Sequence, residues 1–133
     1  MMSSNLMAQI TAPAPMIIYT THGDMGAFLI YPYLFNSSGE WVGFAVSNRD
    51  VYNLEGIFVG CISADQRILR KKYMENLPPK RKVPAPPPKV RTPASVPLPP
   101  QMAEISFDNL DVLEEKPDLL HTMDHGEFRP DAE

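Results

Sequence analysis

At 133 residues and a formal net charge of −4, the chain has the length of one ordinary domain. Cys61 is its only cysteine, so an intramolecular disulfide is excluded. No apolar run approaches the ~20 residues that span a bilayer, and no basic segment precedes an apolar one near the N-terminus. We therefore expect a soluble, cytoplasmic protein.

The bulk charge conceals three blocks. Net charge is −3 over residues 1–69, +7 over residues 70–100 and −8 over residues 101–133. Ten of the fifteen prolines fall between Pro78 and Pro100, whereas six of the seven glycines precede residue 61. These shifts predict four segments: a disordered leader (1–15), a β-hairpin repeat domain (16–73), a basic Pro-rich linker (74–100) and an acidic tail (101–133).

The hairpin domain contains a seventeen-residue repeat. Residues 34–43 and 51–60 both read apolar-aromatic-Asn-x-x-Gly-x-aromatic-Val-Gly, and a repeat of this kind sets the fold. An eroded copy precedes them, with strands expected at 16–19 and 27–31, and Ile68 begins a truncated fourth copy. We expect the last strand to pair with the first, which gives an all-β array of hairpins around a pseudo-symmetric centre.

Each secure copy has the residues of a tight hairpin. Asn36 can hydrogen-bond its own backbone two residues on and so begin a turn. Gly39 suits a turn position with positive φ. Gly43 lies inside the next strand, where glycine is typical of a bend or a bulge. The second copy has the same three residues at the same spacing: Asn53, Gly56 and Gly60.

Both faces of the strand after this turn are apolar. Strict alternation would place Trp41 and Ala45 on one face and Val42 and Phe44 on the other. One face can serve the core, and the other is then available to a second subunit. So small a domain buries only about 60% of its unfolded surface, so we expect a homo-oligomer. Trp41 and its counterpart Phe58 should pack in the core; the alternative is that they line a surface for a small ligand or a glycan.

The Asn-x-x-Gly-x-aromatic-Val-Gly units, followed by a Pro-rich arm and a short acidic-apolar C-terminus, resemble the bacterial 4-fold beta flower proteins. The resemblance covers residues 16–72. It implies β-hairpins arranged around a four-fold pseudo-axis, and it implies no catalytic residues, because the family's role is uncharacterised. Two good copies, one eroded copy and one truncated copy depart from four equal hairpins.

The Pro-rich linker cannot pack a core and should favour an extended polyproline II spacer. Its clustered lysines and arginines could bind nucleic acid or an anionic membrane surface, but aromatic residues that stack on bases are absent from it. The simpler interpretation is a solvated basic linker. A third interpretation is that its proline segments, such as residues 84–88, dock on an aromatic groove.

The acidic tail contains one amphipathic stretch. Ser106 can cap a short helix near 107–116, in which Phe107, Leu110 and Leu113 form an apolar ridge. Such a helix is too short to be stable alone in water, so it should form on binding. We expect these three residues to anchor a protein partner.

No pattern identifies a reaction. His121 and His125 have i, i+4 spacing but lack the glutamate and helical context of a zinc protease motif, so we expect neither a metal nor a cofactor. Cys61 aligns with Phe44 at a strand position that should be buried, which favours an inert thiol over a nucleophile.

The order of these segments predicts a non-enzymatic interaction or scaffold protein. It would be a small self-associating β-domain that displays a flexible arm with a C-terminal binding motif. The alternatives are a β-domain that binds a small ligand or glycan, and a structural component of a phage or other particle.

Overall fold

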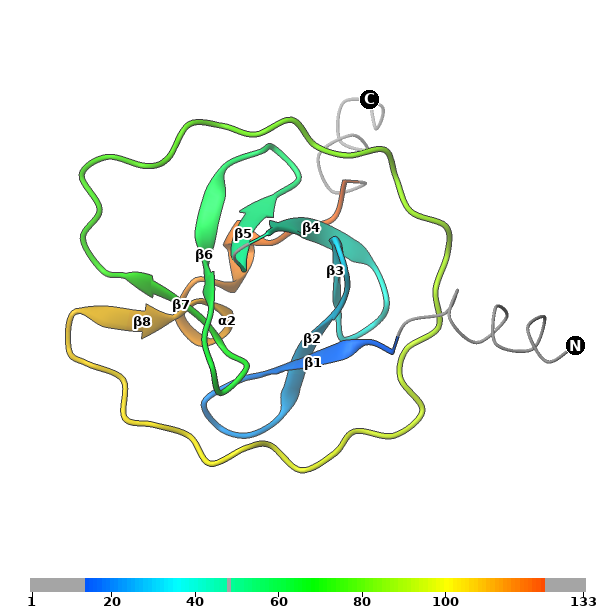
Figure 1. Cartoon of the computed structure of the whole chain (residues 1–133), viewed down its shortest axis with the longest axis horizontal. Helices are drawn as coiled ribbons and strands as arrows, with labels where there is room; N and C mark the ends of the chain where they lie inside the picture. Colours follow the sequence, from blue (N-terminus) through cyan, green and yellow to red (C-terminus); the bar gives the residue numbers. More distant parts are fainter. Residues whose placement is uncertain (1–13, 48, 124–133) are drawn as a thin grey trace, which may run out of the picture.

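The computed structural model describes residues 14–47 and 49–123. Eight antiparallel strands, paired in chain order, form one sheet that curls into a half-barrel (Figure 1). The strands are β1 (Met16–Tyr19), β2 (Met25–Ile30), β3 (Tyr33–Asn36), β4 (Trp41–Val46), β5 (Asp50–Asn53), β6 (Phe58–Ile62), β7 (Ile68–Lys71) and β8 (Asn109–Asp111). Two short helical turns follow, α2 (Val112–Glu115) and η1 (Pro117–Leu119). The all-β prediction is confirmed.

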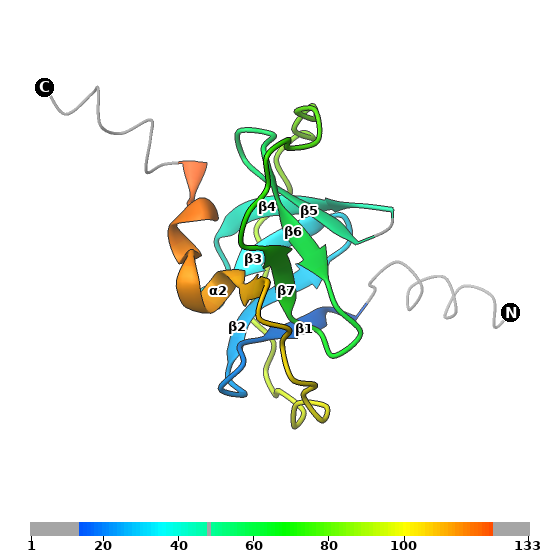
Figure 2. The same cartoon turned by 90° about the vertical axis from the view of Figure 1, so that its left-hand side faces the viewer.

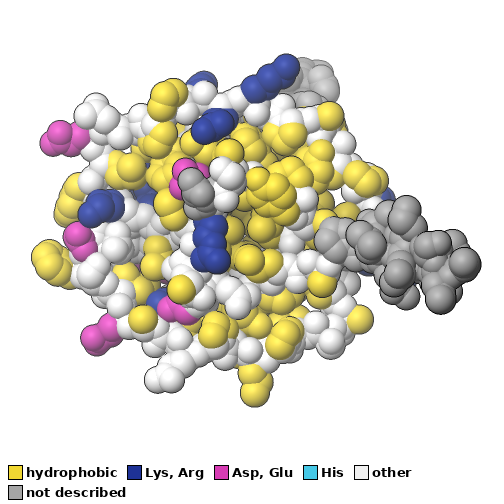
Figure 3. All heavy atoms as spheres, in the orientation of Figure 1, with side chains coloured by type: hydrophobic (Ala, Val, Ile, Leu, Met, Phe, Trp, Pro, Cys, Tyr) yellow, Lys and Arg dark blue, Asp and Glu magenta, His cyan; other side chains and the backbone are white. Residues whose placement is uncertain are grey.

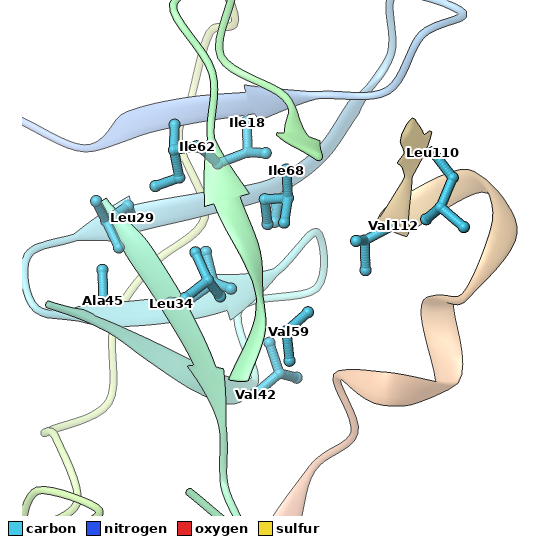
Figure 4. Close-up of a cluster of buried hydrophobic side chains, with 12 residues drawn as sticks. Ile18, Leu29, Leu34, Val42, Ala45, Val59, Ile62, Ile68, Leu110 and Val112 are labelled. Atoms are coloured by element: carbon cyan, nitrogen blue, oxygen red, sulfur yellow. The ribbon is translucent and has the colours of Figure 1, made fainter. Parts of the chain in front are cut away.

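Four consecutive hairpins build the sheet: β1–β2, β3–β4, β5–β6 and β7–β8. Each contributes one fully buried apolar residue to the same inner cluster, at nearly the period of the sequence repeat: Ile18, Leu34, Val51 and Ile68. Figure 4 shows labelled members of this cluster pointing into the space that the strands enclose. The repeated apolar position therefore forms the pseudo-symmetric centre.

The hairpin turns have the geometry expected from the repeat. Asn36 Oδ1 accepts hydrogen bonds from the amides of Ser38 and Glu40, both at 2.9 Å. Gly39 has φ +87°, a conformation that most side chains disfavour. The equivalent turn of β5–β6 uses Asn53 in the same way.

A bulge in each of these hairpins changes which residues face the core. The pairing of β3 with β4 slips by one residue at Val42, and the pairing of β5 with β6 slips in the same way at Val59. Because the extra residue turns inward, Val42 and Ala45 both lie in the inner cluster, while Trp41 and Phe44 lie on the outer face. Strict alternation is therefore wrong for this strand.

The tail completes the fourth hairpin. β7 pairs with β6 and β8 rather than with β1, and residues 72–108 form the connection between β7 and β8. Val112, which follows β8, is fully buried in the inner cluster, as Val42 is in its own hairpin. Leu110 joins the same cluster. The folded unit thus extends beyond the expected boundary at residue 73.

The helix expected near 107–116 is shorter and begins later. Residues 109–111 pair with β7, because the free edge of a sheet offers backbone partners that so short a helix cannot match in water. Asp111, not Ser106, caps α2, and its Oδ1 accepts from the Leu113 amide at 3.1 Å.

The Pro-rich linker lies on the outside of the sheet. In Figure 1 the segment between β7 and β8, green to yellow, encircles the half-barrel. We call residues 74–105 the belt; it contains no helix or strand. It passes closely over the turn glycines of three hairpins, with Pro99 at Gly23, Thr92 at Gly39 and Arg81 at Gly56.

The belt covers the outer aromatic side chains. Val90 and Met102 pack against the cluster that contains Phe35, and Val83 packs against the cluster that contains Tyr52. The face expected to be free for a second subunit is therefore covered by the same chain. The expectation of a free spacer is wrong for this segment, because two apolar faces of a sheet each require cover.

Candidate functional site

A polar cluster closes the seam between the first and last hairpins. Arg67, in the β6–β7 turn, is 1% exposed. Its Nε and Nη2 donate to the Asp65 carboxylate at 3.1 and 2.6 Å, and its Nη1 donates to Thr21 Oγ1 at 3.1 Å. Nη2 also donates to the carbonyl of Ala103 in the belt at 2.7 Å. The guanidinium holds the pKa of Asp65 well below its usual range.

Asp111 extends the cluster to the tail. Its Oδ2 accepts hydrogen bonds from the amide and the hydroxyl of Thr21, at 2.8 and 2.7 Å. Within the described part of the chain, no buried side-chain nitrogen or oxygen lacks a partner. The buried polar groups of the seam therefore all serve to hold the first and last hairpins together.

One mouth of the half-barrel is filled by residues 112–120, which we call the plug. Its Leu113, Leu119 and Leu120 pack against the inner cluster. Asn53 Nδ2 donates to the carbonyl of Leu119 at 3.2 Å, so the β5–β6 turn holds the plug in place. Figure 2 shows α2 on one side of the sheet and the β4–β5 turn projecting on the opposite side.

The three residues expected to anchor a partner are separated. Leu110 is 6% exposed in the core and Leu113 belongs to the plug, whereas Phe107 is 87% exposed. Because two of them pack inside the fold, the tail does not present the expected ridge. The plug also meets the β1–β2 turn, where Glu114 lies 2.5 Å from His22 and raises the pKa of that imidazole.

Trp41 and Phe58 lie on the outer face. Phe58 is buried, whereas Trp41 is half-buried and its Nε1 donates to the carbonyl of Gly43 at 2.8 Å. The Trp41 ring meets Tyr33 edge-on, with ring centroids 5.9 Å apart. A cleft of about 700 Å³ lies between Trp41 and belt residues 87–90. Of the two predicted surface residues, Trp41 therefore borders open space.

The opposite mouth faces the viewer in Figures 1 and 3. Its cavity of about 290 Å³ is lined by apolar side chains from four strands: Met16, Leu29, Ala45 and Ile62. Tyr31, just after β2, borders the cavity and is 59% exposed. Figure 3 shows apolar side chains gathered on this face. We call these five residues the open mouth, and it is the candidate site.

The β4–β5 turn brings Arg49 to the rim. Arg49 lines the cavity, and Asp50 follows it in sequence. Asp50 accepts a hydrogen bond from Cys61 Sγ at 3.2 Å. Partial burial and this carboxylate raise the pKa of Cys61 to about 11, so little thiolate is present near neutral pH. Cys61 is exposed rather than buried, because the bulge at Val59 shifts the alternation.

Among residues 14–47 and 49–123, no three His, Cys, Asp or Glu side chains gather as metal ligands would. His121 lies 3.6 Å from Glu55, and His125 falls outside the described residues. The same stretches contain no helix of the length and apolar character needed to cross a bilayer.

Reasoning from the sequence missed Arg67, Asp111 and Tyr31. The sequence does contain a signal for Asp111. Residues 111–112 take the place of the aromatic-Val pair in the second strand of the fourth repeat copy, which a long insertion separates from the first strand. Arg67 looks like part of a polar turn, and nothing in the local sequence marks it as buried. No pattern marks Tyr31, since its exposure depends on how the hairpins are arranged.

No family model, curated protein or solved structure matches this chain. The likeness to hairpin proteins with a four-fold pseudo-axis stays a prediction.

Proposed function

We propose that this protein is a non-enzymatic interaction module that associates with a second copy of itself through the open mouth. The proposal rests on a difference between the two ends of the core. The plug covers the inner cluster at one end, whereas side chains of that cluster line a cavity at the other. Leu29, Ala45 and Ile62 are themselves buried, so the apolar surface left to cover at the open mouth belongs mainly to Tyr31 and Met16, and covering it contributes about 25 cal/mol per Å².

The charges at the rim favour a second copy as that occupant. Arg49 and Asp50 are adjacent in sequence, and a two-fold interface brings the same surface of both copies together, so opposite charges of the two copies can pair across facing mouths. A partner with one sign of charge would match only one of them. The belt already covers the outer face, so the open mouth is the surface at which self-association of this small fold is expected.

Sedimentation equilibrium over a micromolar dilution series tests the proposal. We expect the wild-type chain to dimerise, and Tyr31→Ser to weaken dimerisation by about 30-fold, as loss of an aromatic anchor does at an interface centre. Tyr73→Ser is the matched control, because Tyr73 is 86% exposed and lies outside the open mouth. It should leave the dimer unchanged.

A charge-reversal pair tests the orientation. Arg49→Asp and Asp50→Arg should each weaken dimerisation alone, and an equimolar mixture should restore it as a heterodimer. A wild-type monomer at the highest concentration, or equal effects of Tyr31→Ser and Tyr73→Ser, would contradict the proposal.

A further inference from the structure

A groove on the outer face carries the most proline-rich part of the belt. This aromatic groove consists of Tyr33, Phe35 and Trp41. Tyr33 Oη donates a hydrogen bond to the carbonyl of Ala85 at 3.0 Å, and Val90 packs against the same aromatic cluster. Residues 84–90, of which four are prolines, therefore lie along the groove.

These contacts match the chemistry by which proteins recognise polyproline II segments. Proline fixes φ and has no N–H, so a proline run presents free carbonyls and apolar rings at low entropic cost. Recognition surfaces pack aromatic rings against such runs. Tyr33 supplies a hydroxyl donor, and Trp41 supplies a ring whose own Nε1 is already bonded to the carbonyl of Gly43.

The belt does not fill the groove. The cleft of about 700 Å³ beside Trp41 is lined by Glu40 on the sheet side and by Lys89 on the belt side. A tethered segment is held at an effective concentration of about 1 mM, so it stays in place even with few contacts. A segment that fits better would cover more of Trp41 and would pair a basic residue with Glu40.

The belt is bound independently on both sides of this stretch. The Arg81 amide donates to a carbonyl of the β5–β6 turn at 3.0 Å, and Tyr19 Oη donates to the carbonyl of Pro97 at 2.7 Å. Between these two points, within the described chain, the Tyr33 hydroxyl makes the one hydrogen bond from the sheet. Residues 84–96 can therefore leave the groove while both flanks, including Val83 on the cluster of Tyr52, stay attached.

We propose that the aromatic groove is a binding site for proline-rich, basic-flanked segments of a partner protein, which exchange with residues 84–96 of the belt. The open mouth contributes nothing to this site, so the inference stands apart from self-association. The chain's own belt is the resident low-affinity occupant that a partner displaces.

Fluorescence of Trp41, the only tryptophan, reports on the groove directly. The belt variant is the full chain with four serine substitutions, at Pro84, Pro86, Pro87 and Pro88. A synthetic peptide of residues 82–92 should change the Trp41 emission of the belt variant in a saturable way. The peptide concentration needed should be at least ~10-fold lower than for the wild-type chain, because the belt of the variant competes more weakly for the groove. The same peptide with these prolines replaced by serine should leave the emission unchanged.

Tyr33→Phe in the belt variant removes the hydroxyl donor and should weaken peptide binding about 5-fold, while a cooperative unfolding transition shows that the variant is still folded. If the belt variant does not fold, the wild-type chain titrated with the two peptides gives the same comparison at higher concentration. The absence of a saturable change at millimolar peptide in the folded protein would overturn the proposal. Equal binding of the serine peptide would overturn it too.

Discussion

Replacing the turn glycines by alanine, one at a time, measures how tightly the belt is held. Gly23, Gly39 and Gly56 have φ of +94°, +87° and +81°, so alanine adds similar backbone strain of roughly 1–2 kcal/mol at each. They differ in the part of the belt above them. At Gly23 and Gly39 the nearest atom to a new Cβ is a side-chain carbon, at 3.6 and 3.3 Å, whereas at Gly56 it is the carbonyl oxygen of Arg81, at 2.3 Å.

A backbone oxygen cannot rotate aside, so Gly56→Ala must displace the belt. This breaks the bond from the Arg81 amide to the Gly56 carbonyl, 3.0 Å long, which adds about 1 kcal/mol. It also lifts Val83 from the cluster of Phe44, Tyr52 and Phe58, which adds about 1 kcal/mol of lost apolar burial. We expect losses of about 1–2 kcal/mol for the two control positions and about 3–4 kcal/mol for Gly56→Ala.

Denaturant unfolding measures these losses, and limited trypsin digestion measures release of the belt. Cleavage after Arg81 and Lys82 should accelerate in Gly56→Ala and stay near the wild-type rate in Gly23→Ala. Equal losses of stability at the three glycines, with equal cleavage rates, would refute the close approach of the belt to the β5–β6 turn.

Three further predictions concern the tail, the thiol and the pH dependence of the plug. Leu110→Ala should lower the free energy of unfolding by about 2–4 kcal/mol because Leu110 is buried, whereas Phe107→Ala, at an exposed position, should change it by less than about 0.5 kcal/mol. Equal effects of the two substitutions in denaturant titrations would contradict the docking of the tail on the sheet. Cys61 should react slowly with iodoacetamide at pH 8, because its pKa is raised to about 11, and Asp50→Asn should speed the reaction; an unchanged rate would exclude a role for Asp50. The pKa of His22 is raised above its ordinary 6.5 and that of Glu114 is lowered below its ordinary 4.5, so their contact stabilises the plug fully between pH 4.5 and 6.5. Hydrogen-exchange protection of the α2 amides should therefore fall as pH rises through the raised His22 pKa. An equal fall in His22→Gln would show that the contact does not stabilise the plug.

The hairpins were predictable because their determinants are local. Asn36 and Gly39 act within one turn, so a short motif specifies them. The bulge was half predictable: Gly43 marks an irregularity, but only the pairing shows that Val42 is the residue that turns inward.

The belt and the open mouth depend on contacts between distant parts of the chain. A proline run cannot form its own core, yet nothing in its composition excludes packing on a core that another segment provides, as residues 84–90 do at Tyr33. Likewise Leu110 and Leu113 have the spacing of a helix ridge, and the free edge of β7 and the unfilled end of the core decide their place instead. Binding of nucleic acid by the basic segment stays the less favoured alternative to a linker.

Amide hydrogen exchange of the wild-type chain, followed by NMR at low and high protein concentration, tests self-association through the open mouth. We expect amides of the β4–β5 turn to gain protection as concentration rises, because a second copy covers the open mouth. The amides of Arg81 and Ala103 should be protected at both concentrations, since they donate to the Gly56 carbonyl and to Asp65 within one chain. Concentration-independent exchange at the β4–β5 turn would rule out association through the open mouth, and unprotected amides at Arg81 and Ala103 would rule out the docked belt.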